Sequence, residues 1–299
     1  MDTRWLEAFL AVAEELHFAR AAERLHMGHS PLSQTIRKLE REVGADLFVR
    51  STRSVALTSA GHAFVPHARK VLEDLRSGRA AVRSGGRRVY GDVTIAFSGA
   101  LNHQTVPPLT RAVRRRHPDI AVRFVDRALS GEALTRLEQG TVDLAFVGLP
   151  FSSPSLDHLL ITVETNHLIV PSEHRLADRR SVHPAELADE AFVCTPREQG
   201  SSMRNALTHG AYAAGFVPVV AQEVLDPYLI LPLVAAGVGV AVVPECFSSI
   251  LPEGVVEIPL EGRYPPLRSA IAWSRDNEAE PLRAVLALAR EVFPEPAAD

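Results

Sequence analysis

The side chains of this chain that are best suited to molecular recognition lie near the N-terminus, where hydroxyl, amide and basic groups recur at helical spacing. Ser33, Gln34, Arg37, Lys38 and Arg41 share one face of a predicted helix, and no carboxylate interrupts the first two turns of that face. Amide and hydroxyl groups read base edges in the major groove of DNA, whereas cations bind phosphates. This face therefore predicts contact with double-stranded DNA.

Two short helices joined by a tight turn are expected to hold this face in place. In residues 18–25 apolar side chains recur at i, i+3, i+4 and i+7, which is the pattern of one buried helical face. We expect Ser30 to be the N-cap of the second helix, Pro31 to occupy its first turn and Gly44 to end it. A further amphipathic helix is predicted over residues 3–15.

Residues 47–58 are predicted to form two short β-strands around Ser51 and Thr52, with Arg50 and Arg53 beside the turn. A basic β-ribbon next to a DNA-reading helix is a wing, and its arginines suit phosphate or minor-groove contact. A helical hairpin with a solvated polar face is the alternative for the two helices alone, but three helices followed by such a ribbon favour a winged helix-turn-helix. The predicted DNA-contacting residues are His29, Ser30, Pro31, Ser33, Gln34, Arg37, Lys38, Arg50 and Arg53.

Four spaced patterns occur in register within the first 70 residues. They are Leu6-x-x-Phe9-x-x-Val12-Ala13-Glu14, Phe18-x-x-Ala21-Ala22-x-x-Leu25, Ser33-x-x-Ile36-x-x-Leu39-Glu40-x-x-x-Gly44 and Leu47-Phe48-x-Arg50-x-x-Arg53-x-x-x-Leu57-Thr58-x-x-Gly61. On these patterns, residues 1–70 resemble the N-terminal domain of LysR-type transcriptional regulators. The family usually has Ser-Gln-Pro where this chain has Gly28-His29-Ser30, and often Arg where it has Gln34. Because those positions resemble base-facing ones, the resemblance implies a shared fold but a different preferred DNA sequence.

Charge and composition fit a DNA-binding module attached to a larger folded part. Residues 1–90 hold 15 Arg or Lys against 10 Asp or Glu, for a net charge of +5, whereas residues 91–299 hold 17 against 26, for −9. The basic segment is the one expected to touch phosphates. At 299 residues, 46% of them hydrophobic, the chain is long enough for at least one further domain.

Cysteine content and hydropathy favour a cytoplasmic protein without membrane contact. Cys194 and Cys246 are too few for a disulfide framework and are expected to be buried, reduced thiols rather than a redox pair. No apolar signal opens the sequence. The longest uncharged apolar run, residues 229–243, contains Pro232 and is shorter than the roughly 20 residues that a membrane span needs.

A long helix is predicted from Thr58 to about Val82, beyond the first domain. Its apolar stripe includes Val71 and Leu75, and a helix outside a finished domain most naturally buries such a stripe against a partner helix. Packing on its own domain is the alternative. The family resemblance implies a linker helix that forms a homodimer, with a homotetramer as the expected assembly. Residues 83–88, rich in Gly and Arg, are predicted to form a hinge.

From Gly91 strands alternate with helices, which is typical of an α/β fold with a parallel sheet. The chain is expected to leave a first lobe near residue 161 and to return to it near 267. It thus resembles the effector domain of the same family, which has two lobes and a cleft like a periplasmic solute-binding protein. The predicted division is 1–58 for the winged helix-turn-helix, 59–88 for the linker helix and hinge, and 89–299 for the effector-binding domain, with lobe I at 89–161 and 268–299 and lobe II at 162–267.

Small hydroxyl residues stand at three predicted helix starts, where ligands of open α/β sheets bind. Each could be an ordinary N-cap, but three at one cleft favour a binding site. The family's effectors are usually small metabolites, often carboxylates, so the resemblance implies a small organic acid, whose binding we expect to close the lobes. The predicted effector-binding residues are Ser98, Asn102, Ser130, Thr195, Ser201 and Ser202.

Sequence motifs of enzymes and metal sites are missing. The chain has no Gly-x-Ser-x-Gly, no phosphate loop with Gly-Lys-Ser/Thr and no His-Glu-x-x-His. His26 and His29 lack a third ligand nearby, so neither a metal nor a cofactor is predicted. We therefore expect a DNA-binding transcriptional regulator that responds to a small molecule. The alternatives are a cytoplasmic small-molecule-binding protein with a dimerising helical head, and an enzyme built on the two lobes.

Overall fold

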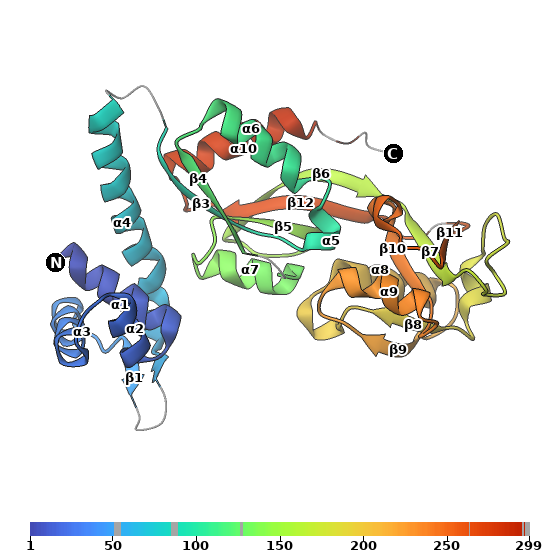
Figure 1. Ribbon diagram of the computed structural model, residues 1–299, viewed down its shortest axis with the longest axis horizontal. Coiled ribbons are helices and arrows are strands. Elements are labelled where there is room, and N and C mark those ends of the chain that lie inside the picture. Colours follow the sequence, from blue (N-terminus) through green and yellow to red (C-terminus); the bar gives the residue numbers. More distant parts are fainter. Residues whose placement is uncertain (51–54, 85–88, 126–127, 263, 295, 297–299) are drawn as a thin grey trace.

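The computed structural model describes residues 1–50, 55–84, 89–125, 128–262, 264–294 and 296. The chain forms a small helical head, a long helix that carries this head, and a larger α/β body of two lobes (Figure 1). The predicted class of fold, a winged helix-turn-helix with a linker helix and a two-lobed α/β domain, is confirmed.

Three helices and a two-stranded antiparallel ribbon make up the head. They are α1 (Thr3–Glu15), α2 (Phe18–Arg24), α3 (His29–Val43), β1 (Phe48–Arg50) and β2 (Val55–Leu57). Asp2 caps α1, because its Oδ1 accepts a hydrogen bond from the N–H of Arg4 at 2.9 Å. α3 ends at Gly44, whose φ of +80° is a conformation that glycine adopts without strain.

The start of α3 differs from the sequence-based prediction. Gly28 is the N-cap residue and makes no side-chain cap bond, so Ser30 lies inside the first turn. Pro31 still fits there, because the N–H groups of a first turn have no partner within the helix and a missing one costs little. The prediction of Ser30 as the cap was therefore wrong.

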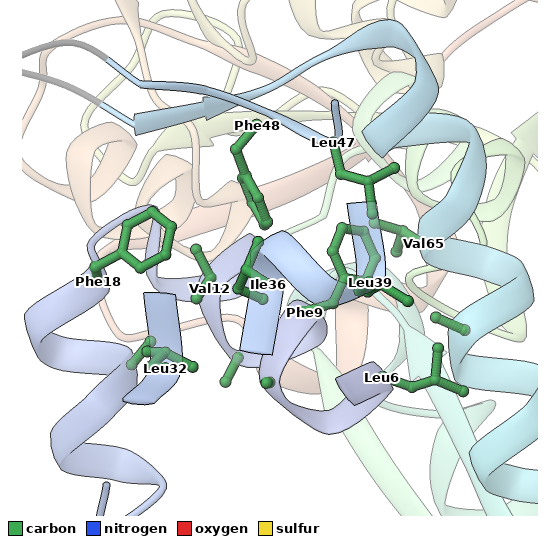
Figure 2. Close-up of a cluster of buried hydrophobic side chains, with 14 of the residues drawn as sticks. Leu6, Phe9, Val12, Phe18, Leu32, Ile36, Leu39, Leu47, Phe48 and Val65 are labelled. Atoms are coloured by element: carbon green, nitrogen blue, oxygen red, sulfur yellow. The ribbon is translucent and has the colours of Figure 1, made fainter. Parts of the chain in front are cut away.

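One apolar core holds the head together (Figure 2). Phe9 of α1 is fully buried, and the centroid of its ring lies 5.5 Å from that of Phe48 and 5.3 Å from that of Phe64. The apolar side of α3 packs into the same core through Leu32, Ile36 and Leu39. Because that side is buried, the polar side of α3 faces outward.

The long helix α4 (Ser59–Ser84) joins the head to the body. Ala68 and Leu72 are buried in the core of the head, whereas Val71 and Leu75 are 48% and 37% exposed. One side of the predicted apolar stripe therefore packs on its own domain, as the alternative had it. The other side is open to solvent in the single chain.

Lobe I is a five-stranded sheet with helices on both faces (Figure 1). The strand order is β4-β3-β5-β12-β6, with α6 and α10 on one face and α7 on the other. The elements are β3 (Gly91–Ala96), α5 (Gly99–Asn102), α6 (Val106–Arg116), β4 (Ile120–Val125), α7 (Ser130–Glu138), β5 (Leu144–Leu149), β6 (Leu156–Glu164), β12 (Leu267–Ser274) and α10 (Glu280–Val292).

This sheet is mixed, whereas the sequence predicted a parallel one. β3 runs parallel to β4 and β5, but β12 runs antiparallel to β5 and β6. β6, which was not predicted, takes the chain out of the lobe and β12 brings it back beside β6, so the two run in opposite directions. β6 continues to Glu164, and the chain passes to lobe II after that residue.

Lobe II contains a three-stranded antiparallel sheet, β10-β7-β11, and a parallel pair, β8 and β9. Its elements, with η for a 3₁₀ helix, are β7 (Asn166–Pro171), η1 (Pro184–Leu187), β8 (Ala191–Cys194), η2 (Arg197–Gln199), α8 (Ser202–Ala213), β9 (Val219–Glu223), η3 (Pro227–Leu229), α9 (Ile230–Ala235), β10 (Ala241–Pro244), η4 (Glu245–Ile250) and β11 (Val255–Pro259).

The two segments that connect the lobes are tied to each other. Nδ2 of Asn166, a buried residue, donates a hydrogen bond to the carbonyl oxygen of Pro265 at 2.6 Å. The two crossovers therefore lie side by side, which is the arrangement of a hinge between two lobes. Across the described ranges, no helix combines the length and the apolar character needed to cross a membrane.

Candidate nucleic-acid interface and ligand cavity

The outer face of α3 presents polar and basic side chains to solvent. Ser33 is half-buried, and the other predicted DNA-contacting residues of this helix are exposed, namely His29, Ser30, Pro31, Gln34, Arg37 and Lys38. As far as the described residues show, the side chains of Arg37 and Lys38 take part in no hydrogen bond or ion pair. Two unengaged cations can neutralise phosphates without first breaking an ion pair.

His29 is the first residue of α3, and its ring packs near an aromatic residue of the core. Its ring centroid lies 6.0 Å from that of Phe18, which is buried in the core of the head. A neutral imidazole has one donor and one acceptor nitrogen, so an exposed ring at this position can hydrogen-bond a base edge.

Glu40 lies on the side of α3 opposite the polar face. Its buried Oε1 accepts hydrogen bonds from the backbone N–H groups of Leu47 at 3.1 Å and Phe48 at 3.3 Å, and so fixes the start of the wing against the helix. Sequence reasoning missed this role, although an acid inside an apolar helical stripe was a signal for it. On the wing, Arg53 and the side chain of Arg50 lie outside the described residues.

A small cavity lies between the lobes, near the carboxyl ends of β3 and β5. Five of the six predicted effector-binding residues line it, namely Ser98, Asn102, Ser130, Ser201 and Ser202. The sixth, Thr195, is fully buried behind the wall and donates a hydrogen bond to Oγ of Ser201 at 2.6 Å. Thr195 can therefore position Ser201, but it does not itself reach the cavity.

The polar groups of the cavity differ in their hydrogen bonding. Oγ of Ser130 accepts a hydrogen bond from the N–H of Gly148, and Oδ1 of Asn102 accepts one from the N–H of Ser98, both at 2.9 Å. Oγ of Ser98 is buried and has no hydrogen-bond partner in the described part of the chain. Burying a hydroxyl without a partner is costly, so a ligand that hydrogen-bonds Ser98 would remove this cost.

Two helices begin at the cavity wall, one from each lobe. The N-cap of α7 is Leu129, which has no polar side chain, so the first N–H groups of α7 have no side-chain cap. α8 is capped by Ser201, whose Oγ accepts from the N–H of Arg204 at 3.4 Å. An uncapped helix N-terminus favours a bound anion. None of the described side chains in the wall is charged, so a carboxylate here would rely on N–H and hydroxyl donors.

The cavity is nearly closed. Its volume is about 10 Å³, enough for about one water molecule. The lobes approach each other closely beside it, where Ser202 of α8 lies against Gly148 of β5, and Gly200 lies against Gly131 of α7. The sequence-based expectation assumed an open cleft that a ligand closes. In this structure the lobes are already in contact.

Sequence reasoning missed the apolar and backbone parts of the wall. Leu101 and Phe146 supply apolar surface, and Gly148 and Ser269 are paired across strands β5 and β12. A serine within the apolar run of β12 was a signal for Ser269. Gly148 offered no such signal, because its place in the site depends on α8, a distant part of the chain.

The two cysteines are free and buried, as predicted. Burial raises the pKa of the thiols of both Cys194 and Cys246, so little reactive thiolate forms at neutral pH. The guanidinium of Arg204 contacts Sγ of Cys194. Among the described residues, no group of three or more His, Cys, Asp or Glu side chains is placed to hold a metal ion.

Comparison with known proteins gives matches over both parts of the chain. Residues 3–62 match the family model "Bacterial regulatory helix-turn-helix protein, lysR family", and residues 86–294 match "LysR substrate binding domain". The chain is 43% identical to the HTH-type transcriptional regulator ShiR of Corynebacterium glutamicum, over 98% of this chain and 99% of that protein. It is 30% identical to the regulator AlsR of Bacillus subtilis, over 93% and 91%.

Solved structures with a similar fold include two full-length proteins. CbnR complexed with its target DNA matches with a TM-score of 0.71 at 25% identity, over 98% of this chain and all of that one. OxyR of Pseudomonas aeruginosa matches with a TM-score of 0.74 at 24% identity, over 98% and 94%. The likeness thus covers head, long helix and body together.

Proposed function

Since this chain belongs to the LysR family of transcriptional regulators, we propose that the exposed face of α3 reads its operator DNA and that a small organic acid binds in the cavity between the lobes. The protein is a DNA-binding regulator with a helix-turn-helix domain and an effector-binding domain, and it is not an enzyme. Which residues contact DNA and which ligand binds are the proposed parts.

The proposed DNA contacts are of two kinds. His29 and Gln34, exposed near the start of α3, are assigned to base edges in the major groove. Arg37 and Lys38, whose charges are unpaired among the described residues, are assigned to phosphates together with the arginines of the wing. The net charge of +5 in residues 1–90 supports this assignment, because binding to DNA is driven by neutralising phosphates.

The observation that carries the ligand proposal is the hydroxyl of Ser98. It is buried without a partner in the described part of the chain, in a wall that also holds the uncapped N-terminus of α7 and has no described charged side chain. A carboxylate has two oxygens, which can accept hydrogen bonds from the Ser98 hydroxyl and from the free N–H groups of the first turn of α7. Leu101 and Phe146, which also line the cavity, would contact an apolar portion of a small acid.

A thermal-shift screen of the full chain against small carboxylic acids tests the ligand. At least one acid should raise the melting temperature, because a ligand that binds the folded state stabilises it by RT ln(1 + [L]/Kd). Ser98→Ala should abolish the shift, and Ser172→Ala, at an exposed serine outside the cavity, should retain it. If no acid gives a shift that depends on Ser98, this class of ligand is excluded.

A ligand found in this way must also be linked to DNA binding. The factor by which the acid changes operator affinity has to equal the factor by which operator DNA changes the Kd of the acid. An acid that binds the cavity but leaves operator affinity, footprint and DNA bend unchanged would show that the cavity is not a regulatory site.

We further propose a cytoplasmic homodimer formed through α4, with two dimers assembled into a homotetramer. The exposed apolar side chains Val71 and Leu75 support α4 as the interface, because a partner helix would bury them. Val71→Glu with Leu75→Glu should lower the mass measured by light scattering, whereas Lys70→Glu, exposed on a different face of α4, should not. An unchanged mass in the glutamate variant would place the interface elsewhere.

A further inference from the structure

We propose that a ligand entering the cleft pushes the two lobes apart, and that Gly148 is the residue that lets the lobes meet. This inference rests on the proposed function, because it takes the cavity between the lobes as the effector site. It reverses the motion predicted from the sequence, in which a ligand would draw open lobes together.

At the cavity the lobes meet through glycines, which have no side chain. A Cβ added at Gly148 of β5 would lie 2.2 Å from both Cβ and Oγ of Ser202 in α8. A Cβ added at Gly200, in the loop before α8, would lie 2.9 Å from Cα of Gly131 at the start of α7. We call Gly148 and Gly200 the glycine seam, since a side chain at either position would not fit between the lobes as they stand.

Hydrogen bonds between side chains also join the lobes beside α5. Oγ of Ser249, in η4 of lobe II, lies 2.9 Å from Nε2 of His103 and accepts a hydrogen bond from Nε2 of Gln104 at 3.1 Å. The closed arrangement is thus held by direct contacts of the protein with itself. It does not depend on a ligand to bridge the lobes.

The space inside the closed cavity is too small for the proposed ligand. It amounts to about 10 Å³, which suits about one water molecule, and even a two-carbon acid has four non-hydrogen atoms. The unpaired hydroxyl of Ser98 gives such an acid a hydrogen-bonding partner in the cavity. The acid can reach it only if the wall of lobe II, formed by Ser201 and Ser202, moves away from lobe I.

Gly148→Ala should therefore reproduce the effect of the ligand. Ordinary van der Waals contact begins at 3.4 Å, so a Cβ placed at 2.2 Å requires the seam to widen by at least about 1.2 Å. The backbone of Gly148 does not have a positive φ, so alanine itself is not strained there. Gly99→Ala is the matched control, because a Cβ at Gly99, beside Ser98 in the same lobe, meets nothing within 4 Å.

The test measures the distance between spin labels on α7 and α8, the two helices that begin at the cavity wall. Gln139→Cys at the end of α7 and His209→Cys in α8 place exposed labels in lobe I and lobe II. The buried thiols of Cys194 and Cys246 label slowly under brief treatment, because burial raises their pKa. Labelled full-length protein is mixed with an excess of unlabelled protein, so that distances within one subunit dominate.

We expect a longer distance for Gly148→Ala than for the parent, and no change for Gly99→Ala. Adding Ser202→Gly to Gly148→Ala removes the opposing side chain and should restore the parental distance. The parent with any acid that binds through Ser98 should also show the longer distance. An unchanged or shorter distance for Gly148→Ala overturns the inference, as does a shorter distance with a bound acid. A shorter distance with a bound acid would leave the proposed ligand class intact. If no acid gives a thermal shift that depends on Ser98, the ligand class is refuted. The distance measured for Gly148→Ala still tests whether this glycine lets the lobes meet.

Discussion

Two serine-to-alanine substitutions in the same cavity should change the stability of the body in opposite directions. Oγ of Ser98 is buried without a partner in the described chain, and such a hydroxyl costs about 1–3 kcal/mol in proteins. Ser98→Ala removes that cost and loses little packing, so the free energy of unfolding should rise by about 1 kcal/mol. Oγ of Ser130 instead accepts a hydrogen bond from the N–H of Gly148, so Ser130→Ala should lower the free energy by about 1 kcal/mol.

Calorimetry of the full-length variants without added ligand measures this difference. A change of 1 kcal/mol shifts the melting temperature of a domain of 150–250 residues by roughly 2–4 °C. We therefore expect the transition of the body to rise by a few degrees for Ser98→Ala and to fall by a similar amount for Ser130→Ala. The transition of the head serves as an internal reference, because neither serine touches it.

The sign of the stability change in Ser98→Ala shows whether the Ser98 hydroxyl has a hydrogen-bond partner in the free protein. If this variant loses as much stability as Ser130→Ala, the Ser98 hydroxyl makes a favourable hydrogen bond in the free protein. A ligand would then gain nothing by replacing a missing partner of Ser98. A gain in stability together with a loss of acid binding is the combination expected of a hydroxyl that is unpaired in the free protein and binds the acid.

Three further outcomes concern the head. Arg37→Ala should weaken operator binding and reduce the salt dependence of binding, d log K/d log[salt], by about one unit. Its free energy of unfolding should change by no more than roughly 0.5 kcal/mol. Equal affinity of variant and parent in a salt titration would remove this residue from the interface. His29→Gln should alter discrimination at one base pair by about 1–3 kcal/mol and leave overall affinity similar, so selection of the same preferred site by both proteins would place His29 off the DNA. Phe9→Ala should cost the head about 3–5 kcal/mol, because its ring is fully buried against Phe48 and Phe64; a head transition that does not move in a thermal scan would contradict the core assignment.

The elements of the head could be predicted because their signals are local. Apolar spacing within single helices defined α1, α2 and α3, and the arginine-flanked turn defined the ribbon of β1 and β2. The cap of α3 was misassigned because Gly28 and Ser30 both suit an N-cap and only the packing of the turn decides between them. Local spacing thus predicts an element well and its first residue poorly.

The body was harder to predict because its sheet is assembled from distant segments. The direction of β12 and the existence of β6 depend on how the chain returns from lobe II, which no local pattern encodes. The candidate effector site shows the same difference between residues with local signals and residues placed by distant parts of the chain. Ser98, Ser130 and Ser201 were found at helix starts, whereas Gly148 became part of the site only through the approach of Ser202 from the other lobe.

The small volume of the cavity also bears on how fast the regulator can respond. If an acid enters only when the seam has opened, its observed association rate should level off at high concentration, at the rate of opening. The apparent Kd is then the intrinsic Kd divided by the fraction of molecules that are open. Substitutions at Gly148 and Gly200 should therefore retune the response time and the sensitivity of the protein to its effector, while the hydroxyl of Ser98 that is proposed to bind the effector stays the same.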